Sequence, residues 1–133
     1  QFDVLGRVLE AASGKPLDVL LRELIFEPCG MEATFFRVPE GRRRDFRCCY
    51  VPDSSGSLVD VSDQAGVFKT YTEDGLGYFS GSEGLVSSAA DFYRFASMLL
   101  NGGICPMTGR QVLSAGSVGE MTRNQMPGDT DMS

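Results

Sequence analysis

Serine and cysteine nucleophiles are present in this sequence, but the base that most often activates them is not. The chain of 133 residues contains no histidine, which excludes a Ser-His-Asp or Cys-His site within it. A lysine can serve as the base where a serine lies three residues before it on a helix. Only Lys15 and Lys69 are present, and neither has a serine at that position. We therefore expect no catalytic residue in this chain.

Carboxylates and cysteines are the remaining candidates for chemistry. Glu83, Asp74 and Asp91 are candidate general acids or bases, but their spacing does not show that they converge. No glycine-rich phosphate-binding motif is present. The four cysteines form no Cys-x-x-Cys pair, so buried free thiols are expected rather than a zinc site. Adjacent Cys48 and Cys49 remain open to disulfide formation in an oxidising compartment. We expect no metal and no cofactor.

The charge balance limits the partners of the chain. A net charge of -6 and a pI near 4.6 argue against a nucleic-acid or anionic membrane surface, because phosphates require a basic face. The exception is a basic cluster at Arg42, Arg43, Arg44 and Arg47, which is either a solvated loop or a site for an acidic partner. No apolar run is long enough to span a membrane, and no signal peptide is evident. The composition is typical of a globular domain, and the compartment cannot be inferred from it.

Two helices are predicted in the first 30 residues. Apolar residues at helical spacing begin at Phe2, and Gly14 is placed to end that helix in a left-handed conformation. No capping residue precedes Phe2, so we expect the natural start of the helix to lie upstream. A second helix is predicted from Pro16, in its first turn, to about Phe26. Pro28 and Gly30 are expected to stop it.

The middle of the chain is predicted to contain short strands, and the last third to be helical. Strands are expected at residues 34–38, 46–51 and 67–72. Ser88 is a candidate cap for the next helix, with Asp91 as its returning acidic partner. Ser114 is a candidate cap for a last helix that runs to about residue 124. The apolar core face of the helix after Ser88 is predicted to comprise Phe92, Phe95, Ala96, Leu99 and Leu100.

Three segments of the sequence resemble the serine beta-lactamase-related family, which includes class C-type beta-lactamases, D-alanyl-D-alanine carboxypeptidases and related esterases. The run from Phe2 to Gly14, followed by residues 25–31, is similar to the family's F-x-L-L-G-x-x-I-E-x-x-S-G and I-x-x-P-L-G-M. Residues 81–91 and 99–103 are similar to its G-G-x-G-L-x-S-T-A-x-D segment and following helix. Leu113-Ser114 and Met121-Thr122 match a weaker third segment. Cys29 stands where leucine is usual, and Glu83 where a small residue is common.

The resemblance implies an α/β (α+β) fold of the beta-lactamase/transpeptidase type, of which this chain supplies mainly the helical lobe with short strands. Residues 1–133 would be a partial domain. The family's S-x-x-K and Tyr-x-Asn motifs would lie upstream, and its [KH]-[ST]-G strand downstream. The parent protein would hydrolyse a small ester, amide or peptide through an acyl-serine, and this chain alone would be inactive. The remainder of the parent would be needed to complete the fold.

The resemblance also implies a use for the loop before the capped helix, which borders the active-site cleft in the family. The residues expected to form a wall of the substrate pocket are Tyr78, Ser80, Gly81, Ser82, Glu83 and Gly84. A carboxylate at Glu83 would disfavour anionic substrates if it faces the cleft. The alternative is that the glycines only allow a tight path of the chain into the helix. A different alternative for the whole chain is a truncated, non-catalytic descendant that acts as a binding module.

Overall fold

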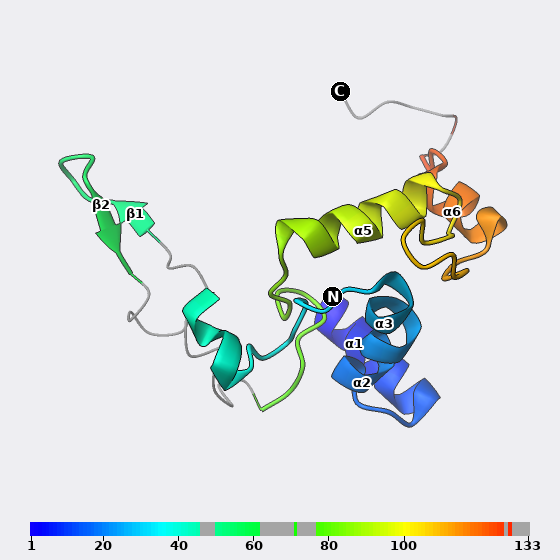
Figure 1. The fold of residues 1–133 in the computed structure, drawn as a ribbon, viewed down its shortest axis with the longest axis horizontal. Helices are drawn as coiled ribbons and strands as arrows, with labels where there is room; N and C mark the ends of the chain where they lie inside the picture. The colour runs from blue at the N-terminus through cyan, green and yellow to red at the C-terminus, as the bar shows by residue number, and fades with distance from the viewer. Residues whose placement is uncertain (46–49, 62–70, 72–76, 127, 129–133) are drawn as a thin grey trace. The chain divides into compact units, whose positions relative to one another are not determined.

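The computed structural model describes residues 1–45, 50–61, 71, 77–126 and 128, and the chain divides into two compact units (Figure 1). Unit 1 comprises Gln1–Arg22 and Ala33–Ser88, and unit 2 comprises Glu23–Glu32 and Ala89–Ser133. The described part of unit 1 contains two α-helices, a 3-10 helix and a two-stranded hairpin. Unit 2 is helical in its described part. The expected mixture of helices with short antiparallel strands is confirmed.

Unit 1 begins with two helices that cross closely. α1 spans Phe2–Ser13 and α2 spans Leu17–Leu21. Gly14 ends α1 at φ 69°, in the left-handed conformation that the sequence predicts. Gly6 is the buried residue of α1, and a Cβ there would lie 3.1 Å from Leu17 Cδ2. The absence of a side chain at Gly6 therefore lets α1 approach Leu17, which is 2% exposed.

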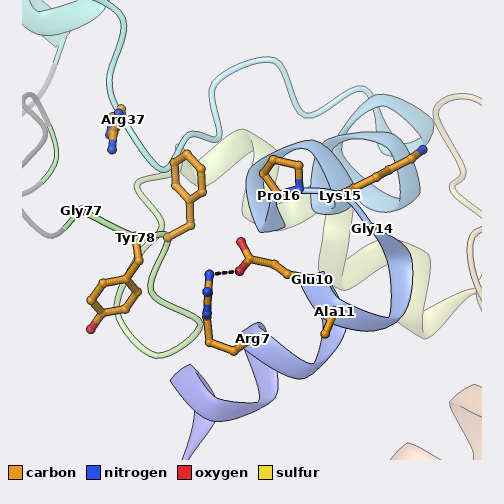
Figure 2. Close-up of a pocket in the computed structure, with 10 residues that line it drawn as sticks. Arg7, Glu10, Ala11, Gly14, Lys15, Pro16, Arg37, Gly77 and Tyr78 are labelled. Carbon is orange, nitrogen blue, oxygen red and sulfur yellow. Dashed lines mark hydrogen bonds and ion pairs between the residues drawn. The ribbon is translucent and has the colours of Figure 1, made fainter.

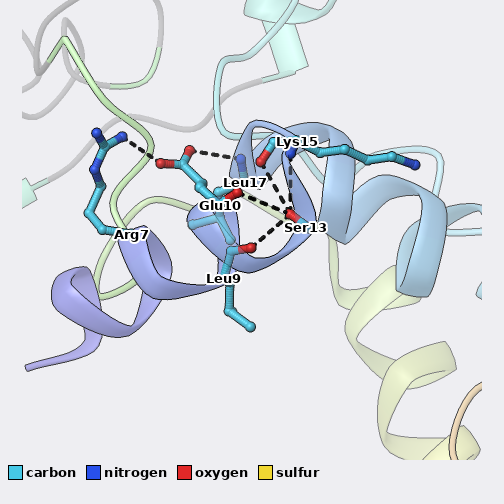
Figure 3. Close-up of polar contacts among 6 residues, drawn as sticks. All are labelled: Arg7, Leu9, Glu10, Ser13, Lys15 and Leu17. Carbon is cyan, nitrogen blue, oxygen red and sulfur yellow. Dashed lines mark hydrogen bonds and ion pairs between the residues drawn. The ribbon is translucent and has the colours of Figure 1, made fainter.

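Side chains of α1 build the turn into α2 (Figure 3). Glu10 Oε1 accepts a hydrogen bond from the Leu17 amide at 2.9 Å and so satisfies a free N–H at the start of α2. Glu10 Oε2 accepts from Arg7 at 2.5 Å. Ser13 Oγ donates to Leu9 O at 2.7 Å and accepts from the Lys15 amide at 3.3 Å. Pro16 is the N-cap of α2 rather than its first helical residue, so the prediction was wrong by one position.

The predicted end of the second helix was also wrong. After Leu21 the chain continues as a π-helical turn, η1 (Arg22–Phe26), and then as α3 (Glu27–Cys29). Pro28 lies in the first turn of α3, where its missing N–H costs no helical hydrogen bond. Gly30 ends α3 at φ 67°. The glycine, not the proline, is therefore the stop signal.

Strand pairing in the described part of unit 1 is limited to one short hairpin and one isolated bridge. Residues 34–38 form one antiparallel bridge, Phe35 with Val86, instead of the predicted strand. β1 (Tyr50–Pro52) begins within the strand predicted at 46–51 and so confirms it at Tyr50 and Val51. It pairs with β2 (Leu58–Asp60), which the sequence analysis did not predict. Residues 46–49 and most of the predicted strand at 67–72 lie outside the described residues.

Two arginines of the basic cluster, Arg42 and Arg44, lie exposed in the 3-10 helix η2 (Glu40–Asp45). Arg42 Nε is 3.5 Å and Arg44 Nε is 3.8 Å from the carboxylate of Asp45. This geometry is that of a solvated turn.

In unit 2 the long helix α5 (Ala89–Leu100) begins directly after Ser88, as predicted. Its buried residues differ from the prediction, because Met98 is 0% and Asp91 1% exposed, whereas Phe92 is 66% and Leu100 90% exposed. The buried Asp91 carboxylate pairs with Arg94 at 2.6 Å. The prediction that Phe92 and Leu100 lie in the core was therefore wrong for the part of the chain that the structure describes.

The segment after α5 is held against α3 within unit 2. Thr108 Oγ1 donates to Pro28 O at 2.6 Å, and Cys105 Sγ to Cys29 O at 3.6 Å. Cys29 and Cys105 are buried free thiols, as predicted, and burial raises the pKa of Cys29 to about 11. Cys48 and Cys49 lie outside the described residues. Gly103 packs so closely that a Cβ there would lie 2.1 Å from Leu113 O.

The last helix confirms its predicted cap. α6 spans Ala115–Thr122, and Ser114 Oγ accepts from the Ser117 amide at 3.0 Å. It ends two residues earlier than predicted, because Arg123 is extended.

Removing the cap gives a direct test of this helix end. Ser114→Ala in the full-length protein is expected to lower the free energy of unfolding by about 1 kcal/mol, measured by urea denaturation. Hydrogen exchange at the Ser117 amide should quicken, because that amide loses its acceptor. Ser114→Asp, which keeps an acceptor oxygen, should restore both values. Equal stability of the alanine variant and the wild type would contradict the assignment.

Candidate functional site

The loop at residues 80–84, called the 80–84 loop below, is organised around one hydroxyl group. Ser80 is 7% exposed. Its Oγ donates to Asp3 Oδ1 at 2.7 Å and accepts from the amides of Ser82 and Glu83, both at 3.2 Å. The Ser82 amide also lies 3.3 Å from Asp3 Oδ1. Ser80 thus ties the loop to the first turn of α1.

The Asp3 carboxylate is suited to this position. The hydrogen bond from Ser80, together with the amides of Ser82 and Gly81, holds the pKa of Asp3 below its ordinary value. Asp3 also lies in the first turn of α1, where the helix dipole favours a negative charge. The ionised form of Asp3 is therefore the one that holds the loop.

Two glycines are required by close approach rather than by a positive φ. A Cβ at Gly81 would lie 2.6 Å from Phe2 O. One at Gly84 would lie 2.2 Å from Ser80 O and 2.6 Å from Phe36 Cε1. All three distances are shorter than non-bonded atoms tolerate, so any larger residue would displace the loop. The alternative reading of these glycines, a tight path of the chain, therefore has geometric support.

A cavity of about 330 Å³ lies along the 80–84 loop. Tyr71 Oη donates to Glu83 O at 2.7 Å and fixes the far side of the loop. Glu83 and Ser82 are exposed, and Gly84 is half-buried. The lining comprises Leu21, Phe36, Tyr71, Ser80, Gly81, Ser82, Glu83, Gly84 and Leu85. Five of the six predicted wall residues therefore line one cavity.

Tyr78, the sixth predicted residue, lies elsewhere in unit 1. It lines a separate open cavity of about 600 Å³ beside α1 (Figure 2). Arg7, Lys15 and Arg37 line that cavity too. Arg7 is paired with Glu10, and the Arg37 guanidinium lies 5.2 Å from the centre of the Phe79 ring. The structure therefore separates Tyr78 from the 80–84 loop cavity.

Two sequence-based candidates for chemistry can be located among the described residues. Ser13 and Lys15 are close in sequence, but Ser13 Oγ is used by main-chain groups and the Lys15 side chain extends away from it (Figure 3). No group of three potential metal ligands occurs among the described residues. In the same part of the chain, no helix is long and apolar enough to cross a membrane. The expectation that this chain holds no catalytic residue stays a prediction.

Sequence reasoning did not identify Asp3, Tyr71 or Phe36 as partners of the loop. Asp3 and Ser80 are 77 residues apart, so no local spacing signals their contact. No sequence pattern distinguishes Ser80, whose hydroxyl is buried, from an exposed serine. Only the position of these residues in the fold brings them together.

Three comparisons place the chain among known proteins. The Beta-lactamase family model matches residues 1–131. A penicillin-binding protein 4 from Amycolatopsis lactamdurans is 35% identical over 131 residues, which cover 98% of this chain and 32% of that protein. The octameric penicillin-binding protein homologue from Pyrococcus abyssi has a similar structure, with a TM-score of 0.65 at 20% identity, over 96% of this chain and 25% of that one. The chain thus spans about a third or less of each of these proteins.

The Ser80 hydrogen bonds can be tested by deleting the hydroxyl. Ser80→Ala in the full-length protein leaves two loop amides and Asp3 without their shared partner, and is expected to cost about 1–3 kcal/mol. Exchange of the Ser82 and Glu83 amides should quicken by NMR. Ser87→Ala is the matched control, since Ser87 does not line the 80–84 loop cavity. Unchanged exchange at both amides would refute the anchoring role.

The same anchor predicts a pH dependence. Because the folded-state pKa of Asp3 is lowered, its stabilising effect is complete above the unfolded value near 3.9 and is lost as the pH falls through the folded value. The hydrogen-exchange protection factor of the Ser82 amide, which is corrected for the intrinsic pH dependence of exchange, should therefore decrease when the pH is lowered below about 4. Asp3→Asn should abolish this acid transition. A transition that persists in that variant would assign it to another carboxylate.

Proposed function

Because the chain belongs to the beta-lactamase family, we propose that the full-length protein is a serine hydrolase that cleaves an ester or amide bond through an acyl-serine intermediate. The observation that carries the proposal is the family match over nearly the whole chain. The 35% identity to a penicillin-binding protein supports it. The substrate class is a small ester, amide or peptide.

In this proposal the chain is a partial domain that lacks the nucleophile. The S-x-x-K and Tyr-x-Asn motifs precede it in the full-length protein, and the [KH]-[ST]-G strand follows it. The 80–84 loop contributes a wall of the substrate cleft. The role of the loop is supported by its preorganised backbone, because the hydrogen bonds of Ser80 and Tyr71 fix the loop in the absence of a ligand.

Exposed apolar side chains support the requirement for the rest of the protein. On α1, Phe2 is 65%, Leu5 52% and Val8 56% exposed. Phe2 and Leu5 lie on one apolar face of the helix, and Val8 lies beside that face. Burying a side chain of this size stabilises a fold by about 1.5–3 kcal/mol. The remaining chain of the full-length protein is therefore the proposed cover of this face.

The 133-residue chain alone is expected to be inactive. The full-length protein should hydrolyse a chromogenic ester or a cephalosporin, and should be labelled by a fluorescent penicillin at one serine that lies outside this chain. The purified chain should show neither reaction. Serine-to-alanine substitution at the labelled position should abolish turnover in the full-length protein.

Two results would contradict this proposal. Turnover by the isolated chain, lost on substitution of one of its own serines, would place the nucleophile within it. A full-length protein that is neither labelled nor active, together with a sharp cooperative melt of the isolated chain as a monomer, would support a non-catalytic binding module instead. A fragment of a larger fold should self-associate or unfold without cooperativity, because its apolar surface is uncovered.

A further inference from the structure

One side chain sets the electrostatic character of the 80–84 loop cavity. Glu83 is the only charged residue among the described residues that line it, and no lysine or arginine is part of that lining. The rest of the wall combines apolar groups, such as Leu21, Phe36 and Leu85, with small polar ones. Among its described lining residues, this cavity therefore offers an apolar surface and the Glu83 carboxylate.

The backbone of Glu83 is fixed on both sides. Its N–H donates to Ser80 Oγ at 3.2 Å, and its C=O accepts from Tyr71 Oη at 2.7 Å. Both partners also line the cavity. The Glu83 Cβ is therefore held in place at the cavity, and the residue is exposed to solvent.

A second negative charge lies behind the loop. Asp3 accepts from Ser80 Oγ at 2.7 Å and lies 3.3 Å from the Ser82 amide. The lowered pKa of Asp3 keeps this carboxylate ionised at neutral pH. Two carboxylates, Glu83 on the loop and Asp3 hydrogen-bonded to Ser80, therefore favour a cation over another carboxylate at this loop.

We propose that Glu83 is a specificity-determining residue, and that the 80–84 loop cavity receives the cationic ammonium end of the substrate. The inference rests on the proposed hydrolase function and names its substrate class: esters or amides that carry an ammonium group on an aliphatic chain. Apolar lining residues contact the chain of the substrate, and Glu83 contacts its charge. Substrates that end in a carboxylate are disfavoured.

The test compares three substrates in the full-length protein. They are p-nitrophenyl esters with acyl chains of equal length that end in a trimethylammonium, a methyl or a carboxylate group. The wild type should show the lowest KM for the cationic ester and the highest for the anionic one. Glu83→Gln should raise KM for the cationic ester about two- to fivefold, the range of an exposed ion pair, and leave the neutral ester unchanged. Glu83→Lys should reverse the order.

Two controls separate charge recognition from a structural effect. Glu40→Gln removes the same charge at an exposed position of η2 outside the cavity lining, and should leave all three KM values unchanged. Raising the salt concentration from 0.01 M to 1 M shortens the screening length from about 30 Å to about 3 Å, and should reduce the preference for the cationic ester. A loss of loop structure would instead affect all three esters equally.

Failure of the inference is distinguishable from failure of the proposed function. If the full-length protein hydrolyses all three esters with equal KM, or if Glu83→Gln changes them equally, the assignment of Glu83 is overturned while the hydrolase proposal stands. If no ester is hydrolysed, the hydrolase proposal fails, and binding of the three compounds is measured by saturation-transfer NMR. Tighter binding of the cationic compound that is lost in Glu83→Gln supports the inference, and equal binding overturns it.

Discussion

The Ser80 hydroxyl is the contact on which the arrangement of the candidate site depends. It donates to the Asp3 carboxylate and accepts from two amides of its own loop, so the start of α1 and the 80–84 loop share one hydrogen-bond centre. At 7% exposure Ser80 has little access to water. A lost partner is therefore costly, because a buried polar group without a hydrogen bond pays the full cost of desolvation. The close approach at Gly81 and Gly84 makes this centre geometrically possible.

The residues that carry the family resemblance have identifiable structural tasks in this chain. Glu10 satisfies the Leu17 amide, Ser13 accepts from the Lys15 amide, and Gly14 adopts the left-handed turn between them. These contacts fix how α2 leaves α1 within unit 1. A sequence motif can therefore be specific for a family without contributing a reacting group. In this chain the first resembling segment builds this support, and the candidate site lies on the second, at the 80–84 loop.

Residue preferences and spacing were sufficient to predict where α1 ends and where α6 is capped, but not which residues of the helices are buried. The end of α1 at Gly14 and the cap at Ser114 follow from neighbouring residues, and both are confirmed. The π-helical turn before α3 was missed, because its cause is not a residue preference that spacing reveals. Phe92 and Leu100 have the periodicity of a core face but are exposed, since periodicity identifies an apolar face without identifying its partner.

The sequence indicated the loop of the candidate site but not the geometry of that loop, and the role of the loop as a wall of the substrate pocket stays a prediction. The loop itself was found through its resemblance to a family segment, and residues 80–84 do line one cavity. Tyr78 was assigned to the same wall because it is close in sequence, yet it lines a different cavity. Asp3 and Tyr71, which hold the loop in place, are distant in sequence and have no common pattern with it. Contacts of this kind are set by the path of the chain, not by spacing.

The most direct test of the account is a crystal structure of the full-length protein acylated by a serine-directed covalent inhibitor such as a penicillin. The account predicts an acyl group on a serine outside this chain, in van der Waals contact with the 80–84 loop, with the Asp3 to Ser80 hydrogen bond intact. An acyl group bound far from the 80–84 loop would contradict the role of this loop as a wall of the cleft. Acylation of a serine within residues 1–133 would contradict the partial-domain account.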